Sequence, residues 1–137
     1  MIEFISRNDF KLCSESSHSS WLSSLISEEQ FKLGDLSIVF CSDEQLLDLN
    51  IQYLNHHTLT DVITFDYSQG SYLSGDVCIS IDRIKDNAKL YDVTFDLELA
   101  RIMAHGVLHL CGYNDKTNDQ KEQMRGKENY YISKLNL

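Results

Sequence analysis

The hydrophobic positions of this chain follow two different periods, which predict a mixture of helices and strands. Five stretches carry apolar residues at helical spacing or follow helix-start signals. They are residues 19–32, 43–53, 82–90, 95–110 and 118–135. Four short runs rich in β-branched and aromatic residues are typical of strands. They are residues 2–5, 36–41, 62–67 and 75–81.

Local signals mark where several of these helices begin and end. Ser42 followed three residues later by Gln45 forms a capping-box pattern, and Thr117 with Gln120 repeats it. Gly112 lies directly after the apolar stretch 95–110, where a left-handed residue commonly closes a helix. These signals predict a long helix that ends in a tight turn, followed by a capped last helix.

The order of the elements indicates the fold class. The segment 68–74 contains one glycine and three serines, so it favours a hairpin-like connection between two of the strands. Strands and helices are otherwise interleaved irregularly, which predicts an α+β fold with a small mixed β-sheet covered by helices. The sequence contains no proline and no glycine-rich linker, so residues 1–137 are interpreted as a single domain.

The composition is that of an ordinary globular protein, with 42% hydrophobic and 24% charged residues. No apolar run approaches the ~18 residues of a membrane span, and the first residues lack the apolar core of a secretory signal. The four cysteines are widely spaced, without a C-x-x-C pair. That spacing favours reduced packing cysteines over disulfides or a cysteine-based zinc site. We therefore expect a cytoplasmic protein without membrane contacts.

The net charge of −9 is distributed unevenly. Residues 1–82 contain 13 acidic and 3 basic residues, whereas residues 83–137 contain 8 acidic and 9 basic residues. This balance argues against tight, general nucleic-acid binding by the whole chain. A binding face restricted to the C-terminal half stays compatible with it.

The most informative chemistry lies in the stretch 105–115, which reads H-G-V-L-H-L-C-G-Y-N-D. His105 and His109 are four residues apart, so they share one face of the predicted helix. A turn at Gly112 then brings Asp115 back toward them. Two imidazoles and one carboxylate can hold a divalent ion and leave a position for water, as catalytic zinc sites do. The alternative interpretation is a pair of core histidines, but two buried imidazoles without partners are costly.

This motif differs from that of the zincin proteases at one decisive position. Their H-E-x-x-H helix carries a glutamate that acts as the general base. Here Gly106 occupies that position. Peptide hydrolysis by the protease mechanism is therefore disfavoured, although the metal site is not.

The same motif resembles the signature of the YbeY family, H-G-x-L-H-L-x-G-Y-D-H. Three further segments match that family in order and spacing, so the resemblance covers roughly residues 36–135. They are L-N-x-x-Y at 49–53, T-D-V-I-T-F at 60–65 and G-D-V-C-I-S at 75–80. The resemblance implies a zincin-like fold with the motif on a central helix. It also implies a metal-dependent single-strand endoribonuclease of ribosomal RNA maturation and ribosome quality control.

Four positions depart from the family pattern. Asp115 stands where the family has its third metal-binding histidine, and Asn114 replaces the preceding aspartate. Leu54 stands at the family's arginine, and Leu59 at its proline. A carboxylate is a competent zinc ligand, so the resemblance implies that His105, His109 and Asp115 hold one divalent metal ion, with zinc the expected one.

Substrate contacts have to come from the neighbouring residues. Lys116 adjoins the expected ligand Asp115 and is the candidate phosphate contact, with a solvated loop residue as the alternative. Arg101 lies one turn before His105, and for it we expect an ion pair with a neighbouring acid, with a place at the rim of the site as the alternative. For Asp61 we expect a turn or cap role. Tyr113 and the pair at 130–131 are candidates for stacking on bases, although packing explains that pair more simply.

The expected partners are ribosomal RNA or ribosomal particles, with a ribosome-associated protein as a further candidate, and not DNA. Two alternatives stay open at this point. One is a non-catalytic ribosome-associated factor whose metal only stabilises the fold. The other is a metallohydrolase that acts on another substrate.

Overall fold

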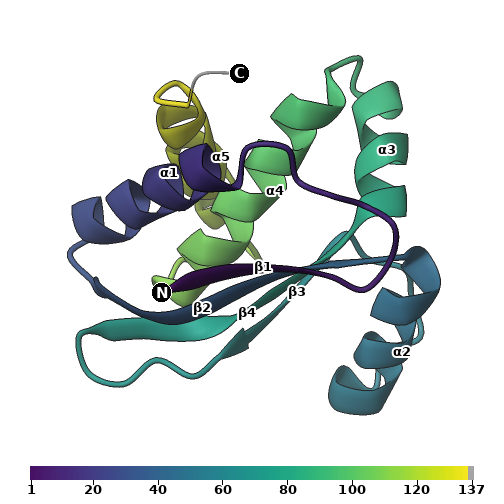
Figure 1. The fold of residues 1–137 in the computed structure, drawn as a ribbon, viewed down its shortest axis with the longest axis horizontal. Helices are drawn as coiled ribbons and strands as arrows, with labels where there is room; N and C mark the ends of the chain where they lie inside the picture. Colours follow the sequence, from purple (N-terminus) through teal and green to yellow (C-terminus); the bar gives the residue numbers. More distant parts are fainter. Residues whose placement is uncertain (136–137) are drawn as a thin grey trace.

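The computed structural model describes residues 1–135, in which five helices and four strands form (Figure 1). In chain order these elements are β1 (Ile2–Ser6), α1 (Glu15–Glu28), β2 (Lys32–Cys41), α2 (Asp43–Leu54), β3 (Val62–Asp66), β4 (Tyr72–Ser80), α3 (Ile81–Leu90), α4 (Phe95–Leu110) and α5 (Asn118–Ile132).

The four strands form one mixed sheet in the order β1-β2-β4-β3. β1 and β2 pair in parallel, as do β2 and β4, whereas β3 runs antiparallel to β4. The connection between β3 and β4 is the hairpin that the segment 68–74 predicts, with Gly70 in the left-handed region at φ +59°. The predicted α+β fold with a small mixed sheet is confirmed.

The alternation of side chains along the strands produces two cores, one on each face of the sheet. Val77 and Ile79 of β4 are fully buried in the large core formed with α1 and α4. Cys78, between them, points to the opposite face, where it packs with Leu46 of α2. Helices α1, α3, α4 and α5 therefore lie over one face, and α2 covers the other (Figure 1).

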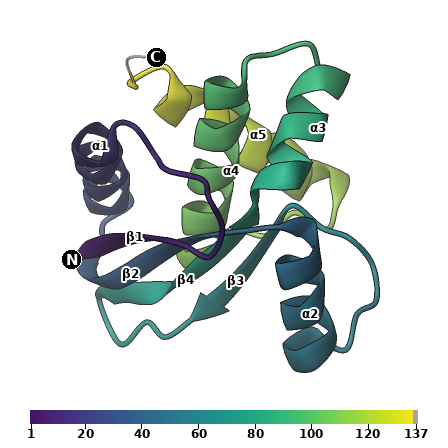
Figure 2. The same ribbon diagram turned by 45° about the vertical axis from the view of Figure 1, so that its right-hand side comes forward.

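Helix α4 lies between α1 and α3 over the sheet and is the central helix of this layer (Figure 2). Its approach to the sheet is unusually close at one point. A Cβ atom on Gly106 would lie 2.5 Å from Cγ1 of Val77, closer than two carbon atoms can pack. The glycine of the H-G-x-L-H motif is thus required by the contact between α4 and β4. This contact fixes the depth at which the two histidines of α4 lie.

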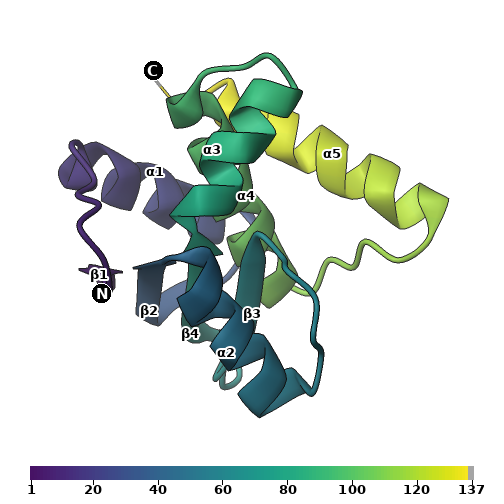
Figure 3. The ribbon, with the colours of Figure 1, turned by 90° about the vertical axis from the view of Figure 1, so that its right-hand side faces the viewer.

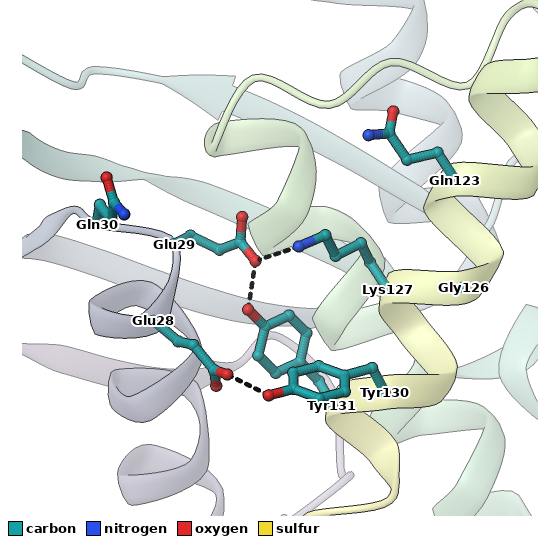
Figure 4. A pocket seen from close by; sticks show the side chains of 8 residues that line it. All are labelled: Glu28, Glu29, Gln30, Gln123, Gly126, Lys127, Tyr130 and Tyr131. Atoms are coloured by element: carbon teal, nitrogen blue, oxygen red, sulfur yellow. Dashed lines mark hydrogen bonds and ion pairs between the residues drawn. The ribbon is translucent and has the colours of Figure 1, made fainter.

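Helix α5 is attached to the C-terminal end of α1 by a group of polar contacts (Figure 4). Glu29 accepts hydrogen bonds from the hydroxyls of Tyr113 (2.7 Å) and Tyr131 and from the ammonium of Lys127 (3.1 Å). The side chain of Glu29 is only 8% exposed. Because one carboxylate binds three donors, the turn after α4 and the helix α5 are both held against α1.

Several element boundaries differ from those predicted. α1 begins at Glu15 rather than at residue 19, because its first turn is serine-rich and carries no apolar period. It ends at Glu28, and Gln30 turns the chain with φ +69°. β2 then starts at Lys32, four residues earlier than predicted, with an irregularity between Leu33 and Leu36 that breaks the alternation. α5 ends at Ile132, three residues before the predicted end.

The cysteines behave as predicted for the part of the chain described here. All four are free, and Cys41 and Cys78 are buried. Within residues 1–135, no helix combines the length and apolar character that a membrane crossing requires.

Candidate metal centre

Helix α4 positions both histidines of the motif. Its start is fixed by Thr94, whose side chain accepts a hydrogen bond from the backbone of Leu97 (3.2 Å). The helix is then held by its apolar face, on which Ala104, Val107 and Leu108 are fully buried. His105 and His109 flank this face, with 18% and 25% of their side chains exposed. Both imidazoles are therefore oriented by a packed helix and remain accessible at one side.

The turn after α4 returns the chain toward the histidines. Gly112 has φ +104°, a conformation that side chains strongly disfavour. The backbone of Gly112 donates to the carbonyl of His109 (3.0 Å), and that of Tyr113 donates to the carbonyl of Leu108 (3.1 Å). The predicted left-handed glycine is confirmed, one residue beyond the helix cap at Cys111.

The structure brings the three predicted residues together. The Nε2 atoms of His105 and His109 lie 3.0 Å apart. Oδ2 of Asp115 lies 3.2 Å from Nε2 of His105 and 3.5 Å from Nε2 of His109. Three potential metal ligands thus form a small triangle, and they come from one helix and the turn that follows it.

The other ring nitrogen of each histidine is bound by an acceptor. Nδ1 of His109 donates to the backbone carbonyl of Tyr113 (2.9 Å). Nδ1 of His105 donates to Oε2 of Glu128 (2.7 Å). Because both Nδ1 atoms carry the proton, the lone pair of each neutral ring is on Nε2, inside the triangle. Metal-binding histidines in proteins are typically held in this way, by a carboxylate or a carbonyl on the outer nitrogen.

The charges at this site favour a cation. Burial opposes protonation of His105, but the carboxylates of Glu128, Asp115 and Asp61 outweigh it and raise its pKa. Burial would raise the pKa of Glu128, yet hydrogen bonds from His105 and Arg101 lower it overall. Two nitrogen lone pairs and a carboxylate facing one another repel unless a positive charge lies between them. The donor set N, N, O suits a divalent ion such as zinc and leaves a coordination position for another ligand.

Two hollows flank the centre, and both reach His105 and Asp115. One, of about 310 Å³, lies against α5. The other, of about 450 Å³, lies between the centre and the segment that connects α2 to β3. Figure 3 shows this segment and the connection between α4 and α5 on the same side of the molecule. The centre is therefore accessible to an extended substrate from two directions.

Glu128 is the residue at this site that the sequence interpretation did not identify. It is 5% exposed and lies on the same face of α5 as the buried Met124 and Tyr131. An acidic residue that lies on the apolar face of a helix indicates a basic partner inside the protein. For Glu128 these partners are His105 and Arg101. The helix α5 was predicted, but which helix face would meet α4 was not.

The other predicted residues have different outcomes. Arg101 forms the predicted ion pair, with its NH1 atom 3.0 Å from Oε1 of Glu128. Tyr131 is buried as predicted, whereas Tyr130 is 43% exposed. Lys116 is exposed and lines neither hollow, so its role as a phosphate contact stays a prediction.

Asp61, for which the sequence predicts only a turn or cap role, lies beside the candidate centre. Its backbone carbonyl accepts a hydrogen bond from the backbone of Ser80 (2.9 Å), which extends the pairing of β3 with β4, so the predicted turn or cap role stays a prediction. Its side chain, however, lines both hollows. Burial raises the pKa of its carboxyl, although the nearby His105 opposes this shift. The side chain thus belongs to the surroundings of the candidate centre.

Comparison with known proteins places these observations in a family. The family model described as Endoribonuclease YbeY matches residues 4–136. A protein of that name from Flavobacterium johnsoniae is 44% identical over 137 residues, covering 100% of this chain and 99% of its own length. One from Flavobacterium psychrophilum is 49% identical over 128 residues, covering 93% and 91%. A solution structure of a Thermotoga maritima protein has the same fold, with a TM-score of 0.69 at 22% identity, covering 97% of this chain and 87% of that protein. The chain therefore belongs to the YbeY family of endoribonucleases.

Proposed function

We propose that this protein is a metal-dependent endoribonuclease that cleaves single-stranded regions of ribosomal RNA during rRNA maturation and ribosome quality control, with zinc as its metal. The observation that carries the proposal is the centre itself. His105, His109 and Asp115 converge, and the outer nitrogen of each imidazole is already bound by an acceptor. The partners are ribosomal RNA or ribosomal particles, with a ribosome-associated protein presenting the substrate, and the place of action is the cytoplasm.

In this proposal the residues of the chain mainly hold the metal ion and orient its two histidine ligands. A divalent ion held by the three residues would supply Lewis-acid stabilisation of a phosphoryl oxygen and would lower the pKa of a coordinated water toward ~7. Glu128 and the carbonyl of Tyr113 hold the Nδ1 protons, so that both Nε2 lone pairs are left free to bind such an ion. Phosphodiester cleavage depends chiefly on stabilising charge in the transition state, which matches a site without a general base on α4.

The contact between Gly106 and Val77 also weakens the peptidase alternative. The zincin mechanism requires a glutamate side chain at the position of Gly106. Even one additional carbon there would lie 2.5 Å from Val77. Position 106 thus packs against the sheet, which leaves no place for a catalytic carboxylate.

An RNA cleavage assay tests the proposal. The purified protein, loaded with zinc, is incubated with a single-stranded ribosomal RNA precursor, then treated with chelator and reloaded. We expect cleavage that is lost on chelation and restored by zinc. A protein that carries one metal per chain and leaves the precursor intact would overturn the enzymatic role.

The non-catalytic alternative is favoured by one observation, the identity of residue 54. Leu54 lines the hollow on the α2 side, where the family pattern has an arginine. If the metal only stabilises the fold, chelation lowers the melting temperature, while association with ribosomes survives substitution of Asp115. The cleavage assay separates the two roles.

A further inference from the structure

The two hollows at the centre differ in charge. The hollow on the α5 side is lined by three basic side chains, those of Arg101, Lys121 and Arg125. The hollow on the α2 side has no lysine or arginine among the described residues that line it. It is lined by apolar residues such as Leu54, by polar residues, and by the acids Asp61 and Asp115, which both hollows share. An anionic substrate that reaches the centre is therefore attracted mainly from the α5 side.

The acidic side chains of the α5-side hollow do not cancel this attraction. Glu128 is bound to His105 and Arg101, and Asp115 faces the two histidines. Glu98 is 4% exposed, Asp61 is half-buried, and burial raises the pKa of both carboxyls. The carboxylates thus face the protein's own groups or are buried, whereas the basic side chains of α5 face solvent.

Two of the three basic residues are available to a ligand. Arg101 already donates to Glu128 and Asn129, at 3.0 Å each. Lys121 is exposed and forms no ion pair with any residue of the described chain. Arg125 is 60% exposed and meets Glu128 only at 3.8 Å. Lys121 and Arg125 are four residues apart, so they lie on one face of α5, about 6 Å apart along its axis.

We propose that Lys121 and Arg125 form a phosphate subsite for RNA on the α5 side of the metal centre. The subsite binds the backbone phosphate next to the one that is cleaved, and so sets the direction in which the strand crosses the centre. It supplies positive charge on the opposite side of the centre from the family arginine that Leu54 replaces. The inference rests on the proposed function and identifies how the same site holds its substrate.

A binding measurement that does not depend on cleavage tests this subsite. The probe is a fluorescein-labelled 2′-O-methyl oligoribonucleotide, and its anisotropy is measured with the zinc-loaded full chain across a range of salt concentrations. For Lys121→Gln/Arg125→Gln we expect weaker binding, and a slope of log affinity against log salt that is smaller by about 0.7, because the subsite binds one phosphate and each phosphate contact on a single strand contributes about 0.7. The matched control is Lys85→Gln/Lys89→Gln, which removes two exposed charges of α3 that line neither hollow.

The outcomes separate the subsite from the function. Unchanged affinity and slope in Lys121→Gln/Arg125→Gln overturn the subsite, even if the unmodified protein cleaves RNA. A protein that does not bind the probe overturns it as well. If binding depends on the two residues but no RNA is cleaved, the subsite stands and the endoribonuclease proposal fails. Lys121→Arg/Arg125→Lys keeps both charges and should restore the slope, which excludes a folding defect as the cause.

Discussion

Nδ1 of His105 lies 2.7 Å from Oε2 of Glu128, a contact that joins the metal-motif helix α4 to the last helix α5. Glu128 also binds Arg101, through its other oxygen at 3.0 Å. One buried carboxylate thus fixes the orientation of a metal ligand and holds a basic residue beside it. This relationship makes α5 a part of the candidate centre, and not only a cover for the core.

Glu128→Gln should weaken the metal site without removing any of its ligands. Loss of the negative charge makes the ring of His105 less basic and less firmly oriented, so we expect the zinc affinity to fall by about 10–100-fold. The measurement is a competition titration against a chromogenic zinc chelator. Glu122→Gln, which changes an exposed acid of the same helix, is the control. Equal zinc affinities in the two variants would contradict the orienting role.

Gly106 and Gly126 offer a matched pair of substitutions. Gly106→Ala places a carbon against Val77 and should destabilise the protein by about 1–3 kcal/mol. Gly126→Ala on α5 meets nothing within 4 Å, so it should stabilise the protein by about 0.5–1 kcal/mol, because alanine favours helix more than glycine does. Urea unfolding at equilibrium gives both free energies. A Gly106→Ala variant as stable as the unmodified protein would show that α4 does not need its close contact with β4.

The environment of Glu29 predicts that the free energy of unfolding depends on pH. Burial would raise the pKa of its carboxyl, but hydrogen bonds from Tyr131, Tyr113 and Lys127 outweigh burial and lower the pKa below the usual value of 4.5. A carboxyl with a lowered folded-state pKa stabilises the protein above its unfolded pKa, and this contribution is lost as the pH falls through the folded pKa. Glu29→Gln should therefore cost about 1–3 kcal/mol at pH 7 and progressively less below pH 4.5.

The measurement for Glu29 is the free energy of unfolding of both proteins at a series of pH values. Glu3→Gln, which changes an exposed acid of β1, serves as the control. A difference between Glu29→Gln and the unmodified protein that stays constant from pH 7 to pH 3 would contradict the role of the carboxylate.

Much of this arrangement could be predicted from the sequence because it is local. The caps at Ser42 and Thr117, the helix 95–110 and the left-handed Gly112 all depend on residues within one or two turns. The spacing of the motif also predicts that its two histidines and Asp115 lie close together, because one helix and the turn after it determine their relative positions.

The rest depends on contacts between distant parts of the chain, which no local pattern contains. Glu128 reaches His105 only because α5 packs on α4, and 23 residues separate the two. The requirement for Gly106 depends on its distance to Val77 in another element. The early start of β2 was missed because polar residues and a break in register obscure the alternation there.

The most direct test of the metal centre is the zinc content of the purified chain and of its ligand variants, measured by elemental analysis after exposure to zinc and dialysis. The unmodified protein should retain one zinc ion per chain, whereas His105→Ala and His109→Ala should each retain none. Asp115→Ala should lose most of its zinc, because the two imidazoles alone provide an incomplete ligand set. Retention of one zinc ion per chain by either histidine variant would contradict the site.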